Sequence, residues 1–163
     1  MQGEPHEAAP EALTRKVPEG RPQKHLEDVS ELYRALGEAA GIEALVQGFY
    51  AQMTTDARFA RIADMHDGQV THHAEKLSSF LTAWLGGPDR YTPRFGHTAL
   101  PLAHGHLAIG SLEVELWLDC MREAATARGI PAPVLNHLIG RLAVPASRIV
   151  ARCSHGALGR GKG

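Results

Sequence analysis

The sequence predicts an all-α domain, on three observations. Apolar residues recur at the three- and four-residue spacing of amphipathic helices in several segments between residues 29 and 142. No segment alternates apolar and polar residues convincingly, as a half-buried strand would, and no internal repeat is visible. The length of 163 residues and the hydrophobic fraction of 44% suit a single domain with one sizeable core.

The two ends of the chain differ from its middle in composition. Residues 1–27 are rich in Pro, Glu, Gly and Ala and lack hydrophobic periodicity, so we expect a flexible N-terminal extension there. Residues 156–163 have the composition of a flexible C-terminal tail. The folded domain is therefore expected to span residues 28–155.

Composition excludes several classes of function. The formal net charge of −1 gives no sign of a nucleic-acid partner or an acidic membrane surface. No run of about 18 apolar residues predicts a membrane span, and the N-terminus lacks the apolar stretch of a secretion signal. Two cysteines, Cys120 and Cys153, are too few for a disulfide framework and fall on apolar helical faces. We expect buried free thiols, which fits a cytoplasmic location.

The first two helices are predicted from their ends and from one apolar face. A short helix is expected over Val29–Leu36, with Asp28 as its N-cap and Gly37 as its end. A second helix is expected over Ile42–Thr54. One face of it collects six residues that we predict to be buried: Ile42, Leu45, Val46, Phe49, Tyr50 and Met53.

A short helical connector, Ala57–Ala63, precedes a longer helix over Gln69–Leu85. The run Gly86-Gly87-Pro88 should end this helix, because glycine allows a left-handed cap and proline cannot continue a helix. One stripe of the helix is predicted to face inward and carries Val70, His73, Ala74, Leu77, Phe80, Leu81, Trp84 and Leu85.

Residues 89–110 break the helical pattern with several Gly and Pro residues, and we expect a loop with about one turn of helix near His104. A long irregular segment inside a compact domain is uncommon and usually functional. A planar cofactor packed against this segment would order it and supply the missing core.

Two more helices complete the fold. Ser111 is the expected N-cap of a helix that runs to Arg128, with Glu113 in its first turn. A last helix should start within residues 131–133 and be kinked or interrupted at Pro145, which has no amide donor. The inner faces of the two helices are predicted to be Leu116, Trp117, Cys120, Met121 and Ala124, and then Val134, Leu135, Leu138, Ile139 and Leu142.

One stretch carries a specific combination of motifs. The chain reads LGGP at residues 85–88, then a tyrosine, then GH, and then His104. His104 stands five residues before Ile109 and thirteen before Trp117, which opens the run WLDCM. Together these motifs resemble the signature of group II truncated haemoglobins, over about residues 30–142. The resemblance implies a 2-on-2 helical sandwich around haem b, which is iron protoporphyrin IX.

The resemblance implies that His104 is the proximal haem iron ligand. A neutral imidazole held through its second ring nitrogen is a standard axial ligand of haem iron. His106 competes by proximity, but it stands where the family usually has proline. This chain departs from the family in two neighbours, with Ala103 where an arginine is frequent and Leu107 where a phenylalanine is usual. These departures weaken propionate anchoring and packing on the proximal side.

On the opposite, distal side the resemblance implies polar groups that stabilise bound ligand. Tyr50 would donate its hydroxyl proton to the ligand, and the indole N–H of Trp117 would point at the same place. His66 is the expected distal residue of the connector, with Met65 as the alternative alignment. His73 would donate to ligand, bind iron as a sixth ligand, or face solvent at the pocket mouth.

Further cofactor contacts follow from the same resemblance. Lys76 matches a basic partner of a haem propionate, and Tyr91 and Arg94 are further candidates. The remaining residues expected against the cofactor are Phe49, Met65, Leu77, Phe80, Leu107, Ile109 and Met121.

The leading functional hypothesis is a haem globin, a monomer or homodimer, that binds dioxygen, nitric oxide, carbon monoxide or peroxide. Its distal residues would suit oxygen transport, nitric oxide dioxygenase chemistry or peroxidase-like chemistry. Turnover would require a separate reductase, because this chain contains no electron donor. A second hypothesis is a non-enzymatic haem sensor or redox protein with His73 as sixth ligand. A third is a helical interaction module without a cofactor.

Overall fold

The computed structural model describes residues 29–97, 104 and 106–159, and within these ranges every regular element is helical. This confirms the predicted all-α fold class. In chain order the elements are α1 (Val29–Ala35), α2 (Glu38–Thr55), η1 (Ala57–Phe59), α3 (Ala60–Ala63), η2 (Asp64–His66), α4 (Val70–Trp84), α5 (Thr92–Phe95), α7 (Ser111–Ala127) and α8 (Ala132–Gly159).

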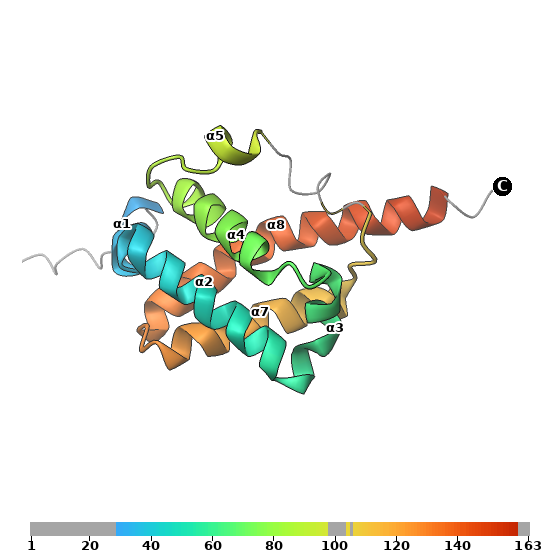
Figure 1. The fold of residues 1–163 in the computed structure, drawn as a ribbon, viewed down its shortest axis with the longest axis horizontal. Coiled ribbons are helices and arrows are strands. Elements are labelled where there is room, and N and C mark those ends of the chain that lie inside the picture. Colours follow the sequence, from blue (N-terminus) through green and yellow to red (C-terminus); the bar gives the residue numbers. More distant parts are fainter. Residues whose placement is uncertain (1–28, 98–103, 105, 160–163) are drawn as a thin grey trace, which may run out of the picture.

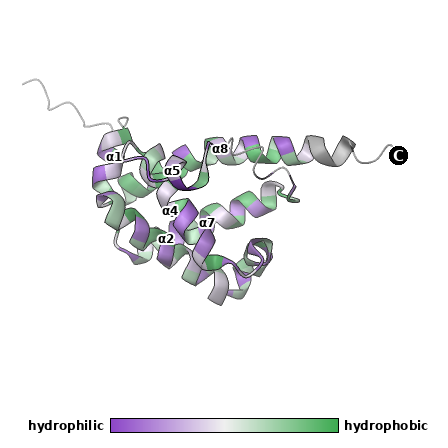
Figure 2. Ribbon diagram, turned by 45° about the horizontal axis from the view of Figure 1, so that its top comes forward, coloured by the Kyte–Doolittle hydropathy of each residue, from purple (hydrophilic) through white to green (hydrophobic). Residues whose placement is uncertain are grey.

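Two pairs of long helices make up the body of the domain (Figure 1). Helix α2 packs against α4, α7 packs against α8, and the two pairs meet through α2 and α7. Helix α1 contacts both α2 and α8, and the short elements η1, α3 and η2 connect α2 to α4. The C-terminal part of α8 runs on past the other helices in both ribbon views (Figures 1 and 2).

Helix α2 lies at the centre of the core. All six residues predicted on its inner face are buried, from Ile42 at 0% to Tyr50 at 5% exposure. Each large apolar side chain transferred from water stabilises the fold by about 1.5–3 kcal/mol. The predicted inner faces of α7 and α8 also lie in or against this core. Figure 2 shows the hydrophilic and hydrophobic residues that alternate around these helices.

The end of α4 follows the prediction from the glycine run. Leu85 is fully buried after the last helical residue, and Gly86 turns the chain with a φ of 87°, in the left-handed region that favours glycine. Gly87 is needed for a different reason, because a Cβ atom there would lie 2.6 Å from the ring of Tyr33. This close approach lets α1 pack on the end of α4.

The start of α7 differs from the prediction. Gly110, not Ser111, is the N-cap, and Ser111 is the first residue of the helix. The Gly110 amide donates to the Glu113 carboxylate at 2.7 Å, and Glu113 also pairs with Arg61 of α3. Glu113 therefore stabilises the helix start, because its carboxylate accepts the backbone amide of the N-cap residue, as the third helical residue does in a capping box.

Helix α8 was predicted to be kinked or interrupted at Pro145; it continues through this residue, so the predicted interruption is wrong. Residues on both sides of the proline are buried, among them Leu142 at 5% and Cys153 at 7% exposure. Packing on both sides therefore offsets the loss of one backbone hydrogen bond. Residues 156–159, which we expected in the C-terminal tail, are helical.

Other boundaries move by a few residues. Helix α2 begins at Glu38, four residues before the predicted start, directly after the left-handed Gly37. The predicted loop over 89–110 contains one additional short helix, α5. Asp28, the predicted cap of α1, lies outside the described residues. Among the helices that the structure describes, none is long and apolar enough to cross a membrane.

Candidate functional site

Five aromatic and imidazole rings from four elements form one continuous cluster, which we call the ring cluster. Phe49 lies edge-on to Tyr50 and to Trp117, each at a centroid distance of 5.0 Å. The Tyr50 ring also lies edge-on to the His66 ring at a centroid distance of 5.3 Å, and the His66 ring lies edge-on to the His73 ring at 4.9 Å. The ring cluster therefore joins α2, η2, α4 and α7, and it brings together the four residues predicted on the distal side.

The α2 part of the ring cluster is held rigidly. Phe49 is fully buried and Tyr50 is 5% exposed. The Phe49 carbonyl accepts a hydrogen bond from the Cys120 thiol at 3.5 Å, which ties this turn of α2 to α7. Burial raises the pKa of Tyr50 above its ordinary value, because the phenolate would lose hydration. Tyr50 therefore keeps its proton at physiological pH and is available as a hydrogen-bond donor.

His66 has a defined tautomer. Its Nδ1 lies 2.8 Å from the Ile62 carbonyl oxygen, which can only accept, so Nδ1 carries the proton. Burial is the main cause of a lowered pKa of His66, and the nearby His104 lowers it further, while the bond to Ile62 opposes the shift. A neutral His66 of this tautomer has an acceptor at Nε2. In this form His66 can accept a hydrogen bond from a neighbouring donor.

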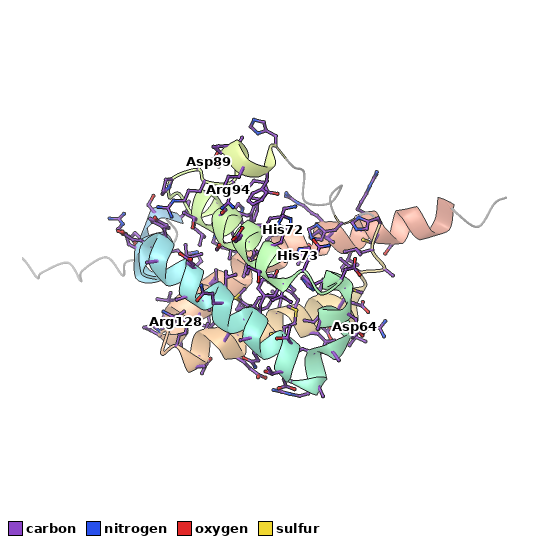
Figure 3. The ribbon with its side chains drawn as sticks, viewed as in Figure 1. Asp64, His72, His73, Asp89, Arg94 and Arg128 are labelled. Carbon is purple, nitrogen blue, oxygen red and sulfur yellow. The ribbon has the colours of Figure 1, made fainter. Side chains whose placement is uncertain are left out.

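His73 connects the ring cluster to the surface. It is half-buried near the start of α4, next to the exposed His72, whose ring lies 5.8 Å away (Figure 3). Burial lowers the pKa of His73, and its neighbours His66, His72 and Lys76 act in the same direction. The neutral imidazole is therefore favoured, and this form can accept a hydrogen bond or bind a metal ion.

His104 is half-buried and has helical backbone geometry. Its influence on the pKa of His66 places it within electrostatic reach of the ring cluster. Two donors meet its carbonyl oxygen: the Leu107 amide at 3.0 Å and the Cys153 thiol of α8 at 3.3 Å. His106, the competing candidate, is exposed. Ala103 lies outside the described residues.

The apolar residues expected against a cofactor include side chains of α4, η2 and α7 and of the segment before α7. Met121 is fully buried in α7. Leu77 and Phe80 on α4 are half-buried and pack against the core, and Leu107 and Ile109 before α7 are half-buried. Met65 is also half-buried, but the contact with Tyr50 is made by its neighbour His66. Of the two connector candidates, His66 is therefore the one that joins the ring cluster.

The three candidate partners for propionates gather around α5. Tyr91 packs on Phe80 and Phe95, with centroid distances of 5.9 and 5.1 Å. The Lys76 ammonium lies 5.6 Å from the centre of the Phe95 ring. Arg94 reaches toward α4 and pairs with Glu75 at 3.1 Å (Figure 3), at the edge of a polar groove of about 520 Å³.

Sequence reasoning missed three contacts around the site. Cys153 is a buried free thiol, as predicted. Its contact with the His104 carbonyl was not predicted. The pairing of Arg61 with Glu113 was missed because the two residues are 52 positions apart. Arg141 of α8 lies over the Trp84 ring at 5.3 Å with its buried Nε unpaired. Only the polar character of Glu113 and Arg141 beside apolar helix faces could have drawn attention to them.

Comparison with known proteins identifies the family. The bacterial-like globin family model matches residues 31–150. The group 2 truncated hemoglobin YjbI of Bacillus subtilis (strain 168) is 32% identical over 118 residues, which cover 72% of this chain and 86% of that protein.

Solved structures agree with this match. The group II truncated hemoglobin from Bacillus anthracis superposes with a TM-score of 0.66 at 31% identity, covering 73% of this chain and 89% of that chain. The group II 2-on-2 hemoglobin from Agrobacterium tumefaciens gives 0.67 at 30% identity, with 72% and 92% covered. The truncated oxygen-avid haemoglobin from Bacillus subtilis gives 0.65 at 31% identity, with 73% and 98% covered. The chain therefore belongs to the bacterial-like globin family, as a group II truncated, 2-on-2 haemoglobin.

Proposed function

We propose that this chain holds haem b through His104 and binds dioxygen and other diatomic ligands reversibly beside Tyr50, Trp117 and His66. Membership of the family implies a haem cofactor. The observation that carries the proposal is the ring cluster itself. It collects a buried hydroxyl donor, an indole and two imidazoles from four elements, within electrostatic reach of His104.

The residues of the chain fit this cofactor in their chemistry. The α4 stripe is only partly buried at Leu77, Phe80 and Trp84, although Leu81 on the same helix is 1% exposed. Half-buried apolar side chains of this kind offer surface that a planar apolar group would cover, at a gain of roughly 25 cal/mol per Å². The buried, unpaired Nε of Arg141 lies beside Trp84 in the same region.

His104 is the residue proposed to hold the iron. When bound, haem iron supplies an open coordination position at which small diatomic ligands bind. The imidazole must be neutral and oriented for this role, and a backbone with fixed geometry orients its side chain. The two hydrogen bonds that the His104 carbonyl accepts provide such a fixed backbone.

Tyr50 is the proposed donor to bound ligand. Its hydroxyl keeps its proton because burial disfavours the phenolate. A buried donor at a ligand that gains negative charge stabilises it more than the same donor would in water. Neutral His66 accepts rather than donates through Nε2, so we assign it the role of orienting the Tyr50 hydroxyl or a water molecule.

Lys76, Tyr91 and Arg94 are the proposed partners of the propionates. Arg94 already pairs with Glu75, but both side chains are about half exposed, at 55% and 51%. Exposed pairs of this kind contribute about 0–1 kcal/mol, so exchanging the partner of Arg94 costs little.

We also propose a use for the bound ligand, based on how fast dioxygen would be released. The Bacillus subtilis relative is described as oxygen-avid. A buried donor such as Tyr50 would likewise give this chain slow oxygen release. Slow release suits oxygen or nitric oxide chemistry with an external reductase better than rapid delivery, and we favour that use.

The test is reconstitution of the purified chain with haem, followed by absorption spectra in the oxidised, reduced and carbon monoxide-bound forms. The proposal predicts a Soret band that develops to a 1:1 ratio and a reversible spectrum with dioxygen. A chain that binds no haem under these conditions would refute it and favour an interaction module without a cofactor.

A second candidate is a haem sensor or redox protein in which His73 is a sixth iron ligand. The observation in its favour is that His73 lies beside His66 in the ring cluster with its pKa lowered, so its neutral imidazole is available. A six-coordinate low-spin spectrum of the reduced, ligand-free protein that becomes five-coordinate in His73→Leu would favour this candidate.

A further inference from the structure

Cys153 is a buried residue of α8 that lies among exposed neighbours over residues 151–154. It is 7% exposed, whereas Ala151, Arg152 and Ser154 on the same turn are exposed. Its thiol lies 3.3 Å from the carbonyl oxygen of His104, 49 residues earlier in the chain. A thiol donates a hydrogen bond to a carbonyl in this geometry, although it is a weak donor.

One partner of this contact, Cys153, lies beyond the residues that the family model matches. The family match ends at residue 150, while α8 continues to Gly159 and runs past the other helices (Figures 1 and 2). Cys153 therefore lies on an extension of α8. The only side chain that this extension buries between residues 151 and 154 is the one that reaches His104.

The His104 carbonyl accepts one hydrogen bond from a nearby residue and one from a residue far away in the sequence. The His104 carbonyl already accepts a hydrogen bond from the Leu107 amide at 3.0 Å, which closes a single turn. This bond fixes the backbone only within the turn itself. The bond from Cys153 connects that turn to α8, so the position of the carbonyl is defined relative to the body of the domain.

The sequence around His104 makes such a restraint useful. The chain has Ala103 directly before His104 and Leu107 three residues after it. Neither side chain carries a hydrogen-bonding group that could anchor the segment. An anchor supplied by another element would compensate.

We propose that Cys153 is a positioning residue for the iron ligand: the extension of α8 holds the backbone of His104 through the Cys153 thiol and so sets the strength and orientation of the iron–histidine bond. This inference rests on the proposed function, in which His104 holds the iron. It assigns the extension of α8 the role of a strap on the proximal side.

The test uses full-length, haem-reconstituted protein and three variants of α8. Cys153→Val keeps the volume of the side chain and removes the donor, Cys153→Ser keeps a donor, and Ser154→Ala changes an exposed neighbour as the control. Two quantities are measured: the iron–histidine stretching band of the reduced, ligand-free protein by resonance Raman spectroscopy, and the rate of haem transfer to an excess of apomyoglobin.

We expect Cys153→Val to shift or broaden the band and to accelerate haem transfer about two- to fivefold, as the loss of one weak hydrogen bond would. Cys153→Ser and Ser154→Ala should stay close to the unmodified protein. An unchanged band and rate in Cys153→Val would overturn the inference. So would equal changes in Cys153→Val and Cys153→Ser, because packing of the sulfur atom would then explain the effect.

The failure of this inference can be distinguished from the failure of the proposed function. His104→Gly should lose the iron–histidine band, and added imidazole should restore haem binding. A band that persists in His104→Gly would refute His104 as ligand, and with it both proposals. A band that depends on His104 but does not respond to Cys153→Val would refute the role of Cys153 alone.

Discussion

Replacing Tyr50 with phenylalanine removes one oxygen atom from the ring cluster and leaves its packing in place. The Tyr50 ring lies edge-on to Phe49 at 5.0 Å and to His66 at 5.3 Å, and a phenylalanine ring would keep both contacts. Tyr50 is 5% exposed, so water does not readily replace the lost hydroxyl. The change therefore isolates the hydrogen bond proposed between the hydroxyl and bound dioxygen.

The expected magnitude follows from burial and charge. A hydrogen bond to a charged group contributes about 1.5–3 kcal/mol when its loss leaves the partner unsatisfied. If the bond breaks before the ligand leaves, this corresponds to a dissociation rate that is about tenfold to a hundredfold faster. Carbon monoxide gains less negative charge when bound, so its dissociation should change much less.

Stopped-flow displacement of dioxygen by carbon monoxide measures this rate. Tyr33→Phe is the matched control, because Tyr33 packs against Gly87 at the end of α4 and is absent from the ring cluster. Its dissociation rate should equal that of the unmodified protein. If Tyr50→Phe releases dioxygen at the unmodified rate, Tyr50 is not the donor and the distal assignment is wrong.

Three further predictions concern stability. Glu113→Ala should lower the free energy of unfolding by about 1.5–3 kcal/mol, because a buried carboxylate accepts the Gly110 amide. Arg61→Ala is the control, since the Arg61 side chain is 61% exposed, and it should cost much less in the same urea titration. Equal losses in the two variants would contradict the capping role of Glu113. The cofactor-free chain should lose stability as the pH falls below about 6.5, since the fold lowers the pKa of His66 and the unfolded chain binds the proton more tightly. Urea midpoints across this range should vary less in His66→Gln, and an identical pH profile would refute the contribution of His66. Gly87→Ala should destabilise the fold by about 1–3 kcal/mol, because a Cβ there would lie 2.8 Å from the Thr82 carbonyl. Gly48→Ala, where a Cβ meets nothing within 4 Å, should leave the stability equal or higher. The opposite order of stabilities would contradict the packing argument.

Helical periodicity predicted the parts of the fold that depend on neighbouring residues. The inner face of α2 was predicted completely, because six residues at helical spacing have one direction in which they can all be buried. The end of α4 was predicted for a similar reason, since the left-handed cap at Gly86 depends on local backbone chemistry. Such features need no knowledge of distant contacts.

The sequence-based prediction was wrong for the N-cap of α7 and for the interruption of α8 at Pro145. Ser111 was a good candidate for the N-cap of α7, but the Glu113 side chain takes the Gly110 amide one residue earlier. Pro145 would interrupt an isolated helix, whereas α8 is held by buried residues on both sides of it. Tertiary packing decides the case of Pro145, whereas at the start of α7 a local bond decides between two neighbouring candidates for the N-cap.

The sequence also suggested which residues of the candidate site lie together. Tyr50, His66, His73 and Trp117 were proposed on the same side of a cofactor from the family resemblance, and the structure gathers them into one ring cluster. The tautomer of His66 could not be predicted, because it depends on the Ile62 carbonyl one helical turn earlier. The contact between Cys153 and His104 joins residues 49 positions apart, and no local pattern predicts such a contact.

The absorption spectrum of the reduced, ligand-free protein tests the central claim most directly, that His104 holds haem iron and leaves the distal side open. Haem-reconstituted protein should give a five-coordinate high-spin spectrum, and His104→Ala should fail to retain haem stably under the same conditions. Retention of haem by His104→Ala with an unchanged spectrum would contradict the claim, because the iron ligand would then be another residue.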